Sequence, residues 1–82
     1  MSSTPHVKNI VGSKIAVARN AHRPPLTQED LSGRLAIFGV SLDRATIAKI
    51  ETNRRGVLDY ELRGFAAALE VDIEWLLGLG NG

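Results

Sequence analysis

The sequence predicts one all-α domain of five short helices. Apolar residues recur at the helical period along the chain, and no segment alternates apolar and polar residues as a strand would. Residues that favour helix N-caps precede four of the apolar stripes, and proline, asparagine or glycine follows several of them. A chain of 82 residues, 44% of them hydrophobic, has enough apolar surface for one core.

The first helix is expected over Asn9–Ala21. Its inward stripe consists of Val11, Ile15, Ala18 and His22. The helix ends before Pro24 because proline disfavours helical geometry at the residue that precedes it. Neither Pro24 nor Pro25 has a backbone N–H to donate, so the segment after the helix forms a loop.

The second helix is expected to begin after Thr27, an N-cap residue that Asp30 completes into a capping box. Leu31 and Leu35 are its apolar residues, and residues 37–41 form its exit and a turn.

Asp43 is expected to cap a third helix over Arg44–Thr52, with Ile47 and Ile50 on the inward side. Asn53 ends this helix because asparagine tolerates the left-handed conformation.

Two further helices complete the domain. Asp59 is expected to cap the fourth, whose inward stripe is Leu62, Phe65, Ala66 and Leu69. Asp72 is expected to cap a short fifth helix over Ile73–Leu77, which stops at Gly78. The domain therefore spans residues 9–78, between a flexible N-terminal tail at 1–8 and a C-terminal tail at 79–82.

Several classes of function are disfavoured by composition. The chain has no cysteine, and its two histidines are isolated, so we expect no disulfide, metal or cofactor. No serine, histidine and acid constellation suggests catalysis, and we expect that the protein is not an enzyme. No apolar run approaches the roughly 20 residues that span a bilayer. Residues 1–8 lack a signal-peptide pattern, so we expect no membrane association and a cytoplasmic location.

Charge is distributed unevenly along the chain. Residues 1–58 contain nine lysines and arginines against four acids, a net charge of +5. Residues 59–82 contain one arginine against five acids, a net charge of −4. Chance clustering in a short chain is one interpretation. The other is a basic surface that binds a polyanion, with the acidic end held away from it.

Four segments follow one another in a familiar order. They are Val11-Gly12-Ser13-Lys14-Ile15 with Arg19, then Leu26-Thr27-Gln28-Glu29-Asp30-Leu31, then Thr46-Ile47-Ala48-Lys49-Ile50-Glu51 with Arg55, and finally Asp59-Tyr60-Glu61-Leu62 with Ala66-Ala67-Ala68-Leu69-Glu70-Val71. With these segments the chain resembles, from Val11 to Gly78, the XRE family, whose Cro/XRE-type domains have the lambda-repressor-like fold. The resemblance implies a helix-turn-helix unit formed by the second and third helices. It also implies a transcriptional regulator, which we expect to be a repressor.

Two loops depart from the family pattern. The stretch from Leu35 to Asp43 is longer than the usual tight turn, and so is the loop that contains Pro24 and Pro25. Asn53 replaces the usual glycine after the third helix and is compatible with the same backbone. The length of this turn affects how far the third helix protrudes.

The third helix is expected to read bases in the major groove, which is about 12 Å wide. Arg44 and Lys49 can donate to guanine, Thr46 can donate or accept, and Ala45 can touch a thymine methyl group. On an ordinary surface helix the same charged residues would only be solvated.

Phosphate contacts are expected on either side of the third helix. Gln28 stands at the first turn of the second helix, where backbone N–H groups and the helix dipole favour an anion. Thr52, Asn53, Arg54 and Arg55 follow the third helix, where the family contacts the DNA backbone. Arg54 lies nearer the buried side if the helix continues, so Arg55 is the preferred contact.

Glu51 would repel DNA if it faced the groove, so a structural role is expected for it. The resemblance implies a partly buried ion pair between Glu51 and Arg19 that ties the first helix to the third.

The C-terminal helix has more apolar residues than its inward positions can bury. Trp75, Leu76, Leu77 and Leu79 are therefore expected to contribute to a homodimer interface. A dimer would bind a palindromic operator in double-stranded DNA. The alternative is a protein–protein interaction module, or an antitoxin-like protein that binds a partner, in which the fold persists with weak DNA binding. Modest net charge and the acidic C-terminal end favour that alternative.

Overall fold

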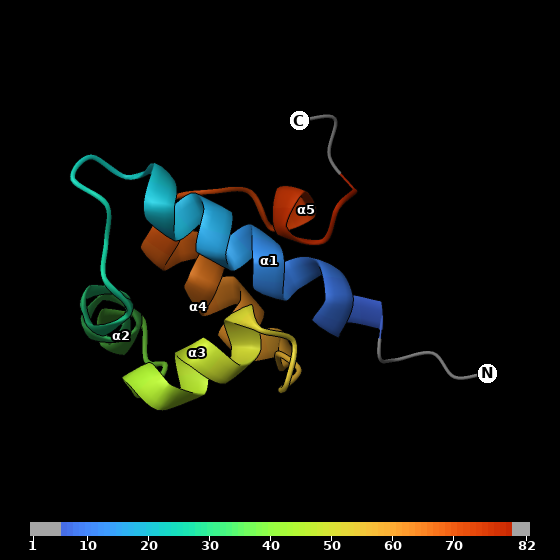
Figure 1. Cartoon of the computed structure of the whole chain (residues 1–82), viewed down its shortest axis with the longest axis horizontal. Coiled ribbons are helices and arrows are strands. Elements are labelled where there is room, and N and C mark those ends of the chain that lie inside the picture. Colours follow the sequence, from blue (N-terminus) through green and yellow to red (C-terminus); the bar gives the residue numbers. More distant parts are fainter. Residues whose placement is uncertain (1–5, 80–82) are drawn as a thin grey trace.

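The computed structural model describes the backbone of residues 6–79 and the side chains of residues 11–79. The described residues form five α-helices and no strand (Figure 1). The helices are α1 (His6–Ala21), α2 (Gln28–Ile37), α3 (Arg44–Glu51), α4 (Asp59–Leu69) and α5 (Ile73–Leu76). The predicted all-α class is confirmed. Both α3 and α5 pack against α1, and α2 packs against α3 and α4.

Helix α1 begins earlier than the sequence indicated. It starts at His6 rather than Asn9, so residues 6–8 of the expected N-terminal tail belong to the helix. Residues 1–5 of that tail, and residues 80–82 of the C-terminal one, lie outside the described residues. The predicted end of α1 at Ala21 is confirmed.

The starts of α2 and α3 follow the predicted capping residues. Thr27 Oγ1 accepts a hydrogen bond from the backbone N–H of Asp30 at 2.9 Å, and Asp30 Oδ2 accepts one from the N–H of Thr27 at 2.9 Å. Asp43 Oδ1 accepts from the N–H of Thr46 at 2.9 Å. Beyond α3, Asn53 adopts the expected left-handed conformation with φ 62°. The capping bonds made by Thr27 and Asp43 satisfy backbone N–H groups that the start of a helix otherwise leaves without partners.

The predicted cap of α4 is wrong. Asp59 is the first residue of the helix, and Leu58 occupies the N-cap position. The carboxylate of Glu61 accepts a hydrogen bond from the N–H of Leu58 at 3.0 Å, which fixes this terminus from inside the first turn. Asp72 does hold the N-cap position of α5, although its side chain makes no capping bond.

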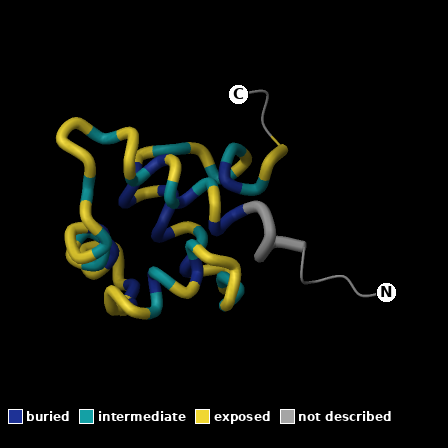
Figure 2. Tube along the Cα trace, viewed as in Figure 1, coloured by how far each residue is buried: buried dark blue, intermediate teal, exposed yellow. Residues whose placement is uncertain are grey.

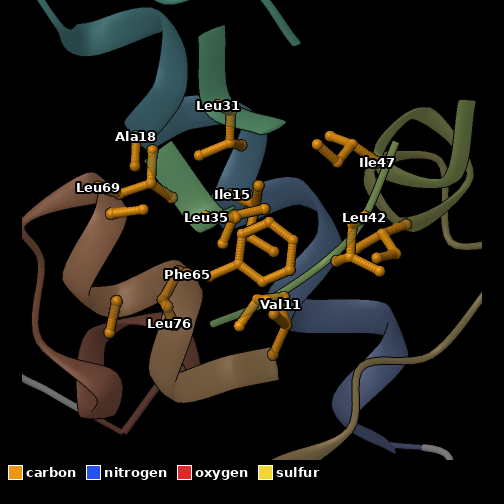
Figure 3. Close-up of a cluster of buried hydrophobic side chains, with 14 residues drawn as sticks. Val11, Ile15, Ala18, Leu31, Leu35, Leu42, Ile47, Phe65, Leu69 and Leu76 are labelled. Atoms are coloured by element: carbon orange, nitrogen blue, oxygen red, sulfur yellow. The ribbon is translucent and has the colours of Figure 1, made fainter. Parts of the chain in front are cut away.

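The core lies where the inward faces of all five helices meet. Phe65 of α4 lies among apolar side chains from the other elements (Figure 3). Figure 2 shows the buried positions on the inner faces of the helices. Among residues 11–79, the apolar side chains with no exposed surface are Val11, Ile15, Leu31, Leu35, Ile47, Ile50, Phe65 and Leu76. Burying such side chains stabilises the fold by about 1.5–3 kcal/mol each.

The long α2–α3 turn is packed against the core. Val40 and Leu42 point inward and are nearly buried. Ser32 Oγ donates a hydrogen bond to the carbonyl oxygen of Leu42 at 2.6 Å. Gly64 of α4 makes room for Val40, because a Cβ at Gly64 would lie 2.5 Å from the Val40 side chain. The turn therefore holds α3 at a fixed position relative to α2.

Helix α1 approaches the C-terminal end of α3 closely at Gly12. A Cβ at this position would collide with the carbonyl oxygen of Ile50, which is backbone and has little freedom to move. Gly33 of α2 provides the contrast, since it is exposed and nothing lies within 4 Å of a Cβ built there.

We expect Gly12→Ala to lower the free energy of unfolding by about 1–3 kcal/mol, because α1 and α3 must separate to admit the methyl group. We expect Gly33→Ala to raise it by about 0.5–1 kcal/mol, because alanine is the better helix former and meets no neighbour. Urea unfolding followed by circular dichroism measures both. Equal effects of the two substitutions would contradict the close approach at Gly12.

Candidate nucleic-acid interface

The expected Arg19–Glu51 ion pair is present. Arg19 Nε lies 2.7 Å from Glu51 Oε2, and Arg19 Nη2 lies 2.9 Å from Glu51 Oε1. The two side chains are 14% and 6% exposed. This two-point contact raises the pKa of Arg19 and joins the C-terminal halves of α1 and α3.

Arg19 also fixes the loop that leads into α2. Its Nη1 donates a hydrogen bond to the carbonyl oxygen of Leu26 at 2.8 Å, and its own carbonyl oxygen accepts from the N–H of Leu26 at 3.1 Å. Gln28 Nε2 then donates to Glu51 Oε1 at 3.0 Å. The end of α1, the start of α2 and the end of α3 therefore meet at one polar cluster formed by Arg19, Gln28 and Glu51.

The outer face of α3 carries the residues expected to read bases. Arg44, Ala45 and Lys49 are exposed, whereas Thr46 is half-buried beside the α2–α3 turn. Helix α3 lies along one side of the molecule, with α1 between it and α5 (Figure 1). The capping bonds from Thr46 lower the pKa of Asp43, so a carboxylate stands at the start of this face.

The segment after α3 is folded back onto the helix terminus. Thr52 Oγ1 donates to the carbonyl oxygen of Ala48 at 2.9 Å and accepts from Arg54 Nε at 3.1 Å. The backbone N–H of Arg54 donates to the carbonyl oxygen of Lys49 at 2.8 Å. Thr52, Asn53 and Arg54 are all exposed next to α3.

Arg55 differs from the expectation. Its guanidinium forms two hydrogen bonds of 3.0 Å with the carboxylate of Glu61, which is 1% exposed. Arg54, in contrast, is exposed. Arg54 does not lie on the buried side, because α3 ends at Glu51 and the helical wheel does not describe residues 54 and 55. Arg55 compensates a buried carboxylate, a role that the sequence reasoning missed.

The residues expected at a dimer interface differ in how far they are exposed. Leu76 has no exposed surface and belongs to the core, so its assignment to an interface is wrong. Trp75 is half-buried, with Lys14 Nζ 4.6 Å from the centre of its ring, in a cation–π arrangement. Leu77 is also half-buried, and Leu79 is 72% exposed.

No family model, curated protein or solved structure matches the chain. Among the residues that the structure describes, no group of three or more histidine, cysteine or acidic side chains could hold a metal ion. No helix in that part of the chain is both long and apolar enough to cross a bilayer. The function therefore has to be inferred from the geometry of this polar cluster and of α3.

We expect Arg19→Ala to lower the free energy of unfolding by about 3 kcal/mol, because Glu51 would keep a largely buried charge without its partner. Thermal melting followed by circular dichroism measures the change. Arg63→Ala is the matched control, since Arg63 is an exposed arginine of α4 and its loss should change stability by no more than about 0.5 kcal/mol. Equal stability of Arg19→Ala and the wild type would show that the pair does not hold the helices together.

The hydrogen bonds from Arg55 lower the pKa of Glu61, although burial opposes the shift. A carboxylate with a lowered pKa stabilises the fold above its ordinary pKa of about 4.3. That contribution is lost as the pH falls through the folded-state pKa. We expect the wild type to lose stability between about pH 5 and pH 3, and Glu61→Gln to be less stable at pH 7 with a shallower acid decline. Urea unfolding across this range measures both curves, and parallel curves would contradict the assignment.

Proposed function

We propose that the protein is a sequence-specific double-stranded DNA-binding regulator with a lambda-repressor-like helix-turn-helix fold. The supporting observation is the outer face of α3, which presents long hydrogen-bonding side chains and no large apolar residue. Hydrogen-bond donors flank this face on both sides, at the start of α2 and in the segment after α3. A helix with such a face fits the major groove, with phosphates on either side.

Base contacts in this proposal come from α3. Arg44 and Lys49 donate to guanine O6 and N7, and the small side chain of Ala45 lets the helix approach a thymine methyl group. Thr46 is half-buried, so it contacts bases only at the edge of the groove.

Phosphate contacts in this proposal come from Gln28 and from residues 52–54. Gln28 is the first residue of α2, where the helix dipole favours an anion. Arg54 supplies the positive charge after α3, in place of Arg55. Glu51 does not oppose DNA binding because Arg19 neutralises it within the cluster. These contacts position the protein, and the α3 contacts specify sequence.

A homodimer belongs to the same proposal. Trp75 lines a shallow groove between α1 and the α4–α5 connection together with Val17, which is 59% exposed. With Leu79 these residues offer apolar surface to a second copy. Two recognition helices would then lie about 34 Å apart and bind a palindromic operator, as a repressor does.

A protein-binding module is the second candidate. Ile37 is 79% exposed and Phe38 is 51% exposed at the C-terminal end of α2. Two neighbouring large apolar side chains on the surface favour contact with another protein. Such binding would not depend on salt in the way that phosphate contacts do.

Selection from a random duplex DNA library, followed by affinity measurements at several salt concentrations, distinguishes the two. We expect an enriched palindromic site. Arg54→Ala should lower the slope of log affinity against log salt by about 1, and Lys49→Ala should cost about 1–3 kcal/mol on the preferred site. Arg63→Ala, next to α5, is the control and should leave the slope unchanged. Weak binding without an enriched sequence would favour the protein-binding module.

A further inference from the structure

We propose that Glu51 is a positioning residue for a phosphate contact made by Gln28. The inference rests on the proposed DNA binding and assigns this carboxylate a second role besides its ion pair. The observation behind it is the 3.0 Å hydrogen bond from Gln28 Nε2 to Glu51 Oε1, which crosses from the first residue of α2 to the last residue of α3.

The bond to Gln28 is additional to what the ion pair requires. Arg19 already donates to both carboxylate oxygens of Glu51, one bond to each. A carboxylate oxygen has two lone pairs, so Oε1 can also accept from Gln28. The amide nitrogen of Gln28 must face the carboxylate, which only accepts hydrogen bonds. Because Arg19 neutralises Glu51, the pair holds this amide without adding net negative charge beside a phosphate.

The second amide N–H of Gln28 is left as a donor at the start of α2. Thr27 takes up the N–H groups of Asp30 and Leu31, through its side chain and its carbonyl oxygen respectively. The backbone N–H groups of Gln28 and Glu29 have no carbonyl partner within the helix. An anion at this terminus would therefore meet two backbone donors and one side-chain donor that is already oriented.

Orientation before binding changes affinity by a limited amount. Immobilising a long side chain at an interface costs about 0.5–1.5 kcal/mol, which corresponds to about a two- to tenfold change in affinity. Glu51 removes part of that cost for Gln28. The effect of Glu51 on DNA affinity should therefore depend on the presence of Gln28. The effect of Glu51 on the stability of the fold should not depend on Gln28.

A double-mutant cycle tests this dependence. Gln28→Ala, Glu51→Gln and the double variant are compared with the wild type for binding to a pool of random-sequence duplex DNA at low salt. In Glu51→Gln an amide NH2 group, which cannot accept a hydrogen bond, replaces one of the two carboxylate oxygens. Arg19 and Gln28 then compete for the one remaining oxygen, which weakens the bond that orients Gln28. The lost negative charge favours DNA binding in both backgrounds alike. We compare the change in DNA affinity that Glu51→Gln causes in the wild type with the change that it causes in the Gln28→Ala background. We expect the two changes to differ by about two- to tenfold, with the less favourable one in the wild type.

Controls separate positioning from destabilisation. Ala68→Gly weakens α4 at a buried position outside the polar cluster of Arg19, Gln28 and Glu51, and it should leave affinity unchanged. Circular dichroism checks that every variant remains folded. Gln28 is the only glutamine in the sequence, so its side-chain amide can also be followed by NMR in the wild type without DNA. We expect a heteronuclear NOE close to the backbone values.

The outcomes distinguish this inference from the proposed function. An equal effect of Glu51→Gln in both backgrounds, or a low NOE for the Gln28 amide, would overturn the positioning role and leave the proposed function intact. Failure of the wild type to bind duplex DNA at low salt would overturn both.

Discussion

Arg19 and Glu51 share two hydrogen bonds at the place where three helices meet, and the arrangement of the domain depends on this contact. The same arginine holds Leu26 and thereby the path of the chain into α2. Both charges are largely removed from water, so each requires the other. One polar contact therefore fixes the relative positions of the two helices that carry the proposed DNA contacts.

Close packing complements that contact at two glycines. Gly12 lets α1 approach the backbone of α3, and Gly64 admits Val40 from the α2–α3 turn. The long turn consequently behaves as part of the core, with Leu42 buried and tied to Ser32. A turn of this length does not loosen the helix pair, because Val40 occupies the space that Gly64 leaves open.

Local capping chemistry could be predicted from the sequence, whereas long-range pairing mostly could not. Thr27, Asp43 and Asn53 act within one helical turn, so their roles follow from neighbouring residues. The Arg19–Glu51 pair joins distant residues and was expected only from a family resemblance. Asp59 was expected to cap α4 because it is a good N-cap residue, but Glu61 fixes that terminus from inside the helix while it also pairs with Arg55. The position of Glu61 three residues after Leu58 was the feature of the sequence that indicated this role. Leu76 could not be assigned to the core without knowing how α5 docks.

The contact between Lys14 and Trp75 determines what an optical probe of this protein would report. Trp75 is the only tryptophan in the sequence, and its ring lies against α1 beneath the lysine ammonium group. Indole emission depends on its surroundings, so intrinsic fluorescence would follow the docking of α5 on α1. Helices α2 and α3 contain no tryptophan, so unfolding confined to them would not change the tryptophan fluorescence directly. If α5 detaches before the remaining helices unfold, fluorescence and backbone signals will give different midpoints, and their separation will measure how independently the terminal helix is held.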